Sequence, residues 1–470
     1  MNVEEYFLTR LFLQRGLAFI YLIAFLIVVN QYRALLGKKG ILPIENFVRQ
    51  LKFKKTPSLF VFYCSDLFLQ VMGWVGIALS CIALLGVSEQ YGLFFSMLVW
   101  FLLWAIYRSF VNVGQIFYGY GWEILLLEAG FLAIFLGSAD VAPSVMMIWL
   151  YRWVLFRMML GAGLIKIRCD SCWKDLTSMT FHYETQPLPG PLSRLFHNLP
   201  VFIHKFSVVF NHFIELVVPF FFFFPGKVGV IGGLFTLLFQ TLLILSGNLS
   251  WLNYITVVLC FSCFPDSFIS VFFPFLKIPI LPAHNIHVGL VILLAMLVVY
   301  LSIKPIKNLF SHHQAMNRSY DPLNLVNTYG AFGSVTRVRR EIIIEGTKDS
   351  IVTEKSEWLP YEFKGKPGSL IRKPPLVSPY HYKIDWQMWF AAMSPYQHHP
   401  WFIPFIQKLL EGEKSVLRLL YKNPFPDRPP TYIRAELYEY HFASLKNKEG
   451  AFWVRKRVGV YIPPVHLINK

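Results

Sequence analysis

The chain has 470 residues, of which 55% are hydrophobic, 17% aromatic and only 15% charged, whereas typical soluble domains are about 25% charged. Its 45 phenylalanines exceed what one soluble core accommodates, so the composition excludes an ordinary soluble protein and indicates a lipid environment. The net charge of +17 would suit nucleic acid, but the basic residues fall in short loops between apolar runs and across the C-terminal third. We therefore expect the lipid bilayer as a partner, and no nucleic acid.

Apolar runs succeed one another as far as Ile303. A hydrocarbon core about 30 Å thick needs about 20 apolar residues of helix, in which backbone groups pair within their own segment. We expect about seven to ten transmembrane helices, and about nine segments are recognisable: Leu11–Val29, Leu67–Val87, Leu93–Tyr107, Ile124–Leu136, Val145–Ile167, Phe206–Phe224, Val228–Leu245, Leu252–Phe264 and Val288–Ile303. Phe268–Leu281, interrupted by prolines, predicts a re-entrant or interfacial piece. Because Glu4 and Glu5 precede the first run, we expect a retained anchor and not a cleaved signal peptide.

The composition changes after Ile303, where Arg, Lys and Pro become common. This change predicts an α-helical polytopic bundle over residues 1–308 and a water-facing, β-rich α+β domain over residues 309–470. Alternating polar and apolar residues predict strands at Arg337–Ile344, Tyr432–His441 and Phe452–Tyr461. Helices are predicted at Asp385–Ala392 and, from an apolar stripe, at Trp401–Leu420.

Ionisable residues inside or beside the apolar runs give the strongest chemical signal. A charge near the bilayer centre costs several kcal/mol, so it normally faces the bundle interior and has a partner. One interpretation is a set of ion pairs that lock helices together, and another is a substrate or proton pathway; a lysine at a helix end also snorkels to the interface. The residues concerned are Arg15, Asp66, Glu123, Glu128, Arg152, Arg157, Lys166, His212 and Glu215. The candidates for catalysis are Lys166, Glu128, Arg152 and Arg157.

Four of the six cysteines form two C-x-x-C pairs, Cys169 with Cys172 and Cys260 with Cys263. Either pair is a candidate for redox exchange, since this spacing lowers a thiol pKa. Together they are candidates for a zinc site, and the third interpretation is that they are inert thiols. The chain has no H-E-x-x-H, G-x-S-x-G or Walker-type motif, so we expect no metal and no cofactor.

Several strings resemble the lipase maturation factor family of multi-pass membrane proteins. They cover almost the whole chain in order: Tyr6-Phe-Leu-Thr-Arg-Leu-Phe-Leu-Gln-Arg-Gly16, Tyr151-Arg-Trp-Val-Leu-Phe-Arg157, Gly161 to Arg168, Asp170-Ser-Cys-Trp173, Tyr183-Glu-Thr-Gln-Pro187, Asn327-Thr-Tyr-Gly-Ala-Phe-Gly333, Ser378-Pro-Tyr-His-Tyr-Lys-Ile-Asp-Trp386 and Trp453-Val-Arg-Lys-Arg457. The resemblance implies residence in the endoplasmic reticulum membrane, help to secreted lipases that fold and assemble into active dimers, and a lumenal C-terminal domain that handles clients. It also implies a link to the redox balance of the lumen.

The chain departs from this pattern at Cys169, where the family is expected to have glycine, so Cys172 alone matches. With so few cysteines a bacterial relative is an alternative, and its membrane would be the inner one. The positive-inside rule places the basic loop Arg33–Lys55 in the cytosol and, with nine spans, also the C-terminus. This places the C-terminal domain on the opposite side from the lumenal domain of the family. For the C-terminal domain we expect the lumenal side that the resemblance implies.

The leading hypothesis is a membrane-embedded maturation factor, or chaperone, whose soluble domain holds partly folded clients, such as lipases, near the bilayer. The aromatic-rich stretch Tyr380–Trp401 is the candidate client surface, with Tyr380, His381, Tyr382, Asp385 and Trp386 as its candidate residues. The alternative is that these side chains form the domain core or its seam with the bundle. The competing functional hypothesis is an integral membrane enzyme with a buried Glu/Arg/Lys site, based on a weaker similarity to vitamin K-dependent gamma-carboxylase-type bundles.

Overall fold

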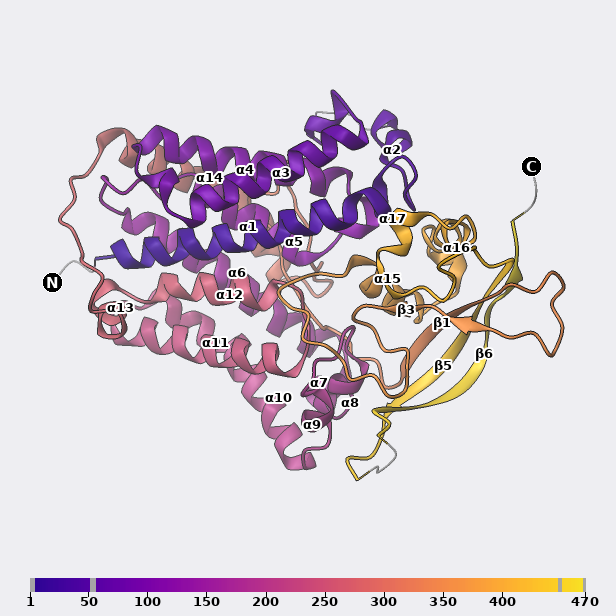
Figure 1. The fold of residues 1–470 in the computed structure, drawn as a ribbon. Coiled ribbons are helices and arrows are strands. Elements are labelled where there is room, and N and C mark those ends of the chain that lie inside the picture. Colours follow the sequence, from indigo (N-terminus) through magenta and orange to yellow (C-terminus); the bar gives the residue numbers. More distant parts are fainter. Residues whose placement is uncertain (1–4, 51–55, 447–449, 468–470) are drawn as a thin grey trace.

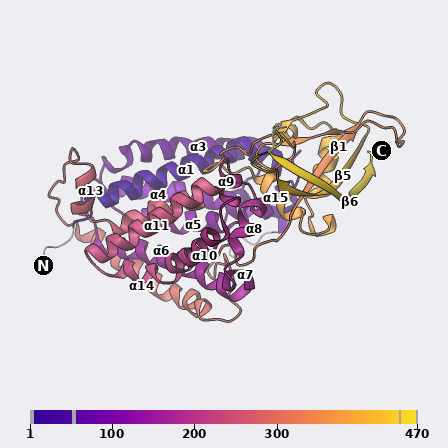
Figure 2. The same cartoon turned by 90° about the horizontal axis from the view of Figure 1, so that it is seen from below.

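The computed structural model describes residues 5–50, 56–446 and 450–467 as a helical bundle with a mixed α/β domain at one end. Figure 1 shows the first residues of α1 (Phe7–Leu36) at the end of the bundle farthest from this domain. The view from below in Figure 2 gives the same arrangement. The molecule is therefore elongated, and one end of the bundle carries the whole of the sheet.

Among the described residues, seven helices are long and apolar enough to cross a membrane. They are α1, α3 (Asp66–Leu84), α4 (Leu93–Val113), α6 (Val145–Cys169), α10 with the 3-10 helix η4 (Val201–Phe223), α11 (Lys227–Ser246) and α14 (Asn285–Leu309). An eighth span results if α12 with η5 (Leu252–Cys263) and α13 (Asp266–Phe272), which are bent by 116°, count together. The predicted class, a bundle of about seven to ten helices, is confirmed.

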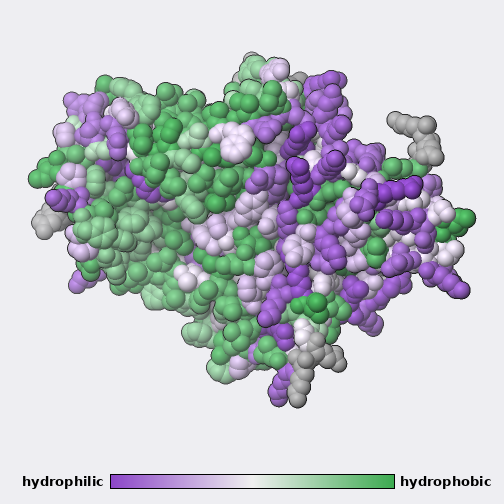
Figure 3. Space-filling view, in the orientation of Figure 1, coloured by the Kyte–Doolittle hydropathy of each residue, from purple (hydrophilic) through white to green (hydrophobic). Residues whose placement is uncertain are grey.

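The outer surface of the bundle is apolar. On α14, for example, Leu293, Val299 and Tyr300 are 60%, 70% and 70% exposed. Figure 3 shows hydrophobic residues over the bundle and mainly hydrophilic ones over the C-terminal domain. Such an extended exposed apolar surface is typical of contact with lipid and not with water.

α1 forms the centre of the bundle, and its close neighbours carry glycines where they approach it. A Cβ at Gly76 of α3 would lie 2.3 Å from the ring of Phe25, so only glycine permits this contact. The shorter α5 (Gly121–Ala133) corresponds to the predicted span Ile124–Leu136 and packs against α1, α4 and α6. Its Glu123 and Glu128 are both buried.

The remaining helices are short and connect the long ones. They are α2 (Ile44–Gln50), η1 (Leu59–Val61), η2 (Val87–Glu89), η3 (Gln115–Tyr118), α7 (Ser171–Lys174), α8 (Ser178–Thr185) and α9 (Ser193–His197). Figure 1 shows α2 and α7 to α9 at the end of the bundle that carries the C-terminal domain. The described part of the loop after α1, as far as Gln50, therefore lies at the same end of the bundle as that domain.

The C-terminal domain is built on an antiparallel sheet with the strand order β2-β1-β5-β6. The strands are β1 (Arg339–Thr347), β2 (Leu359–Pro360), β5 (Tyr432–Phe442) and β6 (Trp453–Val465), and β3 (Glu362–Phe363) pairs with β4 (Leu420–Lys422). The helices of this domain are α15 (Lys383–Ala391), η6 (Tyr396–His398), α16 (Phe402–Leu410) and α17 (Lys414–Leu417). The predicted α+β class is confirmed, with all three predicted long strands in place.

The predicted helix Trp401–Leu420 is wrong in its extent. Helix α16 ends at Leu410, and Gly412 follows with a φ of +66°, a left-handed conformation that terminates helices. The chain restarts as the single turn α17 and then enters β4. The apolar stripe continued past Gly412 because Val416 and Leu419 are buried in the same core.

Residues 310–335, between α14 and β1, have no helix or long strand and fold back against the bundle. Leu325, Val326 and Tyr329 belong to the main hydrophobic core, together with residues of α1, α5 and α6. The predicted division of the chain at residues 308 and 309 stays a prediction. This returning segment supplies part of the site described next.

Candidate functional site

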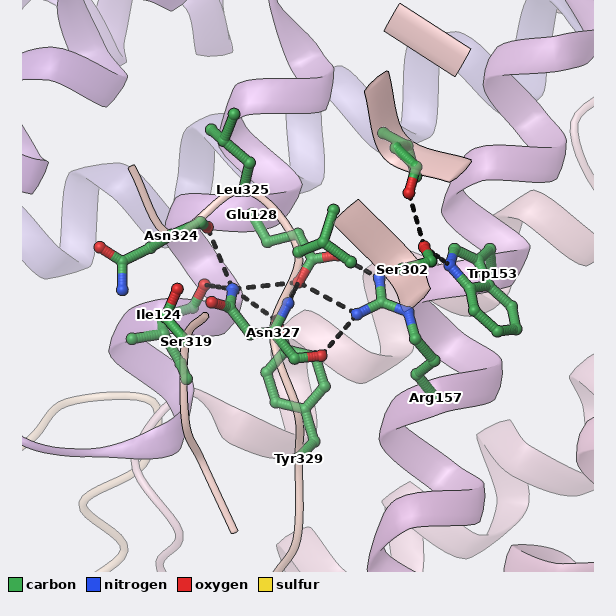
Figure 4. A network of polar contacts seen from close by, with 12 residues as sticks. Ile124, Glu128, Trp153, Arg157, Ser302, Ser319, Asn324, Leu325, Asn327 and Tyr329 are labelled. Carbon is green, nitrogen blue, oxygen red and sulfur yellow. Dashed lines mark hydrogen bonds and ion pairs between the residues drawn. The ribbon is translucent and has the colours of Figure 1, made fainter. Parts of the chain in front are cut away.

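Glu128 of α5 and Arg157 of α6 form a buried ion pair at the centre of a polar network (Figure 4), and each side chain is 1% exposed. The Glu128 carboxylate also accepts hydrogen bonds from the Asn327 backbone N–H at 2.9 Å and from the Tyr329 hydroxyl at 2.6 Å. Arg157 donates to the Asn327 carbonyl at 2.6 Å. Because Asn327 and Tyr329 belong to the segment after α14, the ion pair anchors this segment between α5 and α6.

Lys166 near the end of α6 pairs with Glu215 of α10, with its Nζ 2.6 Å from Oε2. Asn211 donates to the same carboxylate at 2.9 Å, and the Lys166 ammonium lies 5.1 Å from the centre of the Trp173 ring. Both charged side chains are 5% exposed, so Lys166 does not snorkel to the interface. This ion pair forms part of the wall of a cavity.

Lys383 at the start of α15 pairs with Glu123 of α5 across the junction of domain and bundle. The distance from Nζ to Oε1 is 2.9 Å and both side chains are 0% exposed. The Tyr107 hydroxyl also donates to Glu123. The Gln31 side chain of α1 accepts from the Lys383 N–H at 3.1 Å and donates to the His381 carbonyl at 2.7 Å. The domain is thus joined to α1, α4 and α5 at one buried point.

Burial shifts the pKa values of His381 and Lys383 at this junction. It lowers the pKa of His381, with the nearby Lys383 charge acting in the same direction, so this imidazole is neutral. Burial also lowers the pKa of Lys383, whereas Glu123 opposes that shift. The rings of Tyr120, Trp122 and Trp386 enclose His381, whose side chain is 0% exposed.

A further contact joins β1 to the segment after α8. Arg339, which is 1% exposed, donates to the backbone carbonyls of Glu184, Gln186 and Pro187 at 2.5 to 3.1 Å and forms an ion pair with Glu341. Three strings that carry the family resemblance, at 183–187, 327–333 and 378–386, therefore meet where the domain touches the bundle. Their common role in this structure is to fix the domain in place.

The structure separates the four candidates for catalysis. Arg157 and Glu128 form one network and Lys166 belongs to another. Arg152 makes no ion pair with a carboxylate in the part of the chain described; it donates to the carbonyls of Ser262 and Phe222 and to the Tyr6 hydroxyl. The interpretation of the intramembrane charges as helix-locking ion pairs therefore applies to Arg157 and Lys166 and not to Arg152. The four side chains do not face one common site.

The client-binding candidates lie at the junction. His381, Asp385 and Trp386 are buried, whereas Tyr380 and Tyr382 are half-buried. Both tyrosines line a polar cleft of about 520 Å³, together with Asp385 and residues at the end of α1. Burial raises the pKa of Asp385 to about 6, although its carboxylate accepts two backbone hydrogen bonds. The client-binding role of these residues stays a prediction.

The cysteines of the two C-x-x-C pairs are free thiols, of which Cys169 is exposed and the other three are buried. Burial and the hydrogen bond with Asp170 raise the pKa of Cys172 to about 11, which disfavours the thiolate that redox exchange requires. No group of three or more metal-ligating side chains occurs among the described residues. A redox role of Cys169, Cys172, Cys260 and Cys263 stays a prediction.

Sequence reasoning missed Lys383 and Gln31. Lys383 looks like an ordinary helix-start lysine, and its only signal is its position among aromatic residues, in Tyr382-Lys-Ile-Asp-Trp386. Gln31 stands alone in the last turns of an apolar helix. The role of Lys383 is recognisable only once Glu123 lies beside it in the fold. The role of Gln31 is recognisable only once the backbone of residues 381–383 lies beside it.

These features define a multi-pass membrane protein whose extramembrane domain is fixed to its bundle by buried ion pairs. Its sequence matches the models of the lipase maturation factor transmembrane domain over residues 8–271 and of the lipase maturation factor C-terminal domain over residues 325–463. The chain belongs to the lipase maturation factor family, as the resemblance implied.

The similarity extends along whole relatives. The chain is 41% identical to lipase maturation factor 1 of Mus musculus, covering 99% of this chain and 88% of the relative, and 41% identical to that of Homo sapiens, covering 99% and 89%. It is 30% identical to lipase maturation factor 2 of Xenopus tropicalis, covering 96% and 81%. No solved structure matches this chain.

Proposed function

We propose that the protein is a maturation factor of the endoplasmic reticulum membrane that helps secreted clients, such as lipases, to fold and assemble. The names of the relatives support the maturation role, since these relatives align with nearly the whole chain. We propose further that the C-terminal domain faces the lumen and acts as a chaperone there. The observation that carries the chaperone role is the buried junction at Lys383 and Glu123, which holds the domain at a fixed place at one end of the bundle. The proposed lumenal orientation rests on membership of the family.

The surface best suited to a client is the outer edge of the sheet. β6 is the last strand in the order β2-β1-β5-β6, and Figure 1 shows it on the side away from the bundle. An edge strand has free backbone N–H and C=O groups that pair with an added strand. Val454, Val458 and Val460 of β6 are about half exposed, at 48%, 49% and 56%. Arg455 and Lys456 of the same strand are exposed as well, so an extended client segment that combines apolar and acidic residues matches this edge.

The cleft lined by Tyr380 and Tyr382 is a second contact that we propose for the client. It lies next to the end of α1, at the membrane side of the domain. Its rings are held in place because Tyr380 and Tyr382 pack against each other, with 5.1 Å between ring centres. A client bound at both places would span the domain from its outer edge to the bilayer.

The double variant Val458→Glu/Val460→Glu is expected to reduce secretion of active lipase by about fivefold or more, because each charge must be desolvated when a client strand pairs with β6. The measurement is lipase activity per lipase polypeptide in the medium of cells that lack their own maturation factors. Ile371→Glu, at a position 70% exposed outside the sheet, serves as the control and is expected to secrete normally. Equal secretion by both variants, at equal membrane levels, would refute the role of β6.

The orientation of the domain is tested by an added glycosylation acceptor. Lys348→Asn creates the sequence Asn-Asp-Ser in an exposed turn after β1. If the domain is lumenal, this variant is expected to gain one glycan that endoglycosidase H removes. Lys348→Asn combined with Ser350→Ala lacks the acceptor and gives the reference mobility. A variant that keeps the mobility of this control would place the domain in the cytosol, as the basic loop predicts.

A further inference from the structure

A cavity of about 340 Å³ lies where helices of the bundle meet the C-terminal domain. Its walls come from α6, α8, α10, α11 and α12 and from residues 329–334, and α15 closes it from the side of the domain. It reaches the surface beside Met316 and Asn317, both of which are exposed. This volume is near the lower end of the range for small-molecule pockets, which is about 300–1,000 Å³.

Three buried polar side chains in this wall have hydrogen-bonding capacity that the described residues leave unused. The Gln240 Oε1 of α11 has no hydrogen-bond partner in the described structure. Asn253 of α12 and His182 of α8 are 3% and 5% exposed, and their side chains make no hydrogen bond to another described residue. Since buried polar groups are nearly always paired, these three are suited to a bound molecule that supplies the missing partners.

The charge of the cavity is balanced within its own wall. Lys166 and Glu215 neutralise each other, and Asn211 completes the carboxylate's hydrogen bonds. Burial lowers the pKa of His182 to about 4, helped by the Lys166 charge, so this ring is neutral. A charged headgroup would have to be desolvated without finding an uncompensated opposite charge. The polar end of the occupant is therefore uncharged.

The rest of the lining is apolar and adaptable. Met158, Met159 and Met179 present flexible thioether side chains, which accommodate varied apolar shapes. Trp386 and Phe390 of α15 add aromatic surface on the domain side. Since α6, α10 and α11 are membrane-spanning helices, the bilayer is the nearest reservoir of apolar molecules.

We propose that this cavity binds an uncharged single-chain lipid, with its hydroxyl or carbonyl head at Gln240 and Asn253 and its chain among the methionines. The binding site lies between the bundle and α15, so an occupant contacts both parts of the molecule. This inference does not depend on the client-binding surface proposed for β6.

The probe is a monoacylglycerol that carries a photoreactive diazirine in its chain, added to the purified full-length protein in detergent. The matched probe is the fatty acid with the same chain, which is anionic and lacks the glycerol head. We expect the monoacylglycerol to label peptides of α6 and α11 that line the cavity, at least about tenfold more strongly than the fatty acid, and unlabelled monoacylglycerol to compete. Equal labelling by both probes, or labelling confined to the outer bundle surface, would overturn the proposal.

Two variants test the assignment of the head and the chain. Gln240→Leu with Asn253→Leu removes the proposed partners of the head, and Ala162→Phe fills the cavity from α6. Each is expected to reduce labelling about tenfold, whereas Thr241→Leu, on the exposed face of the same helix as Gln240, is expected to label normally. Undiminished labelling of correctly folded Ala162→Phe would overturn the proposal. Wild-type labelling no higher than the background measured in detergent without protein would also overturn it, because that result would indicate a cavity filled by water.

Discussion

Lys383→Met is expected to lower the free energy of unfolding by about 3–5 kcal/mol, because it leaves a buried Glu123 carboxylate without its opposite charge. The two side chains are fully buried and 2.9 Å apart. Methionine retains most of the volume of lysine, so the effect is due to charge and not to a void. The change is measured by titrating the purified protein in mild detergent with a denaturing detergent.

Two controls separate the loss of a partner from the loss of a lysine. Lys383→Met combined with Glu123→Gln removes both charges and keeps an acceptor for the Tyr107 hydroxyl, so most of the stability is expected to return. Lys422→Met, on the exposed strand β4, is expected to change stability by no more than about 0.5 kcal/mol. If the double variant were as unstable as Lys383→Met, the ion pair would not be the cause.

Arg157→Met is expected to cost a similar amount, about 3–5 kcal/mol, and more than Arg152→Met on the same helix. Arg157 is the partner of the buried Glu128, and its removal leaves that carboxylate unpaired in the bundle centre. Arg152 has carbonyl and hydroxyl partners, so its replacement removes a buried charge without leaving another one unpaired. We expect Arg152→Met to cost about 1–3 kcal/mol, the penalty for unpaired acceptors.

The comparison of these two arginines also tests whether the Glu128–Arg157 network serves the stability of the protein. Stability is measured for both variants under the same titration, and Arg157→Met combined with Glu128→Gln is the recovery variant. Recovery of stability in this double variant is expected, because the neutral amide still accepts from Asn327 and Tyr329. If Arg152→Met were less stable than Arg157→Met, the Glu128–Arg157 pair would not be the more important of the two contacts for the stability of the bundle.

Local patterns were sufficient for most of the elements. The apolar runs located all seven long helices of the described residues, and alternation located β1, β5 and β6, because burial against lipid or a core imposes the period of each element on its own residues. The same patterns gave the wrong extent for the helix at Trp401–Leu420. There Val416 and Leu419 are buried by the fold beyond Gly412, which an apolar stripe alone does not distinguish from a continuous helix.

Only some residues of the candidate site could be predicted from the sequence. The list of intramembrane charges contained Glu123, Glu128, Arg157, Lys166 and Glu215, all of which prove to be buried. It did not contain Lys383, since nothing local marks this residue as buried. The polar cleft and the cavity are formed by side chains from many elements, and neither has a sequence signature of its own.

Composition, periodicity and long matching strings are properties of the chain alone, and they predicted a bundle surrounded by lipid, a sheet domain after it and the family. The pairing of each buried cation with its carboxylate became known only from the fold. The partners in the three central pairs are 29, 49 and 260 residues apart. Such contacts follow from how helices and returning segments pack against one another, and no spacing along the chain encodes them.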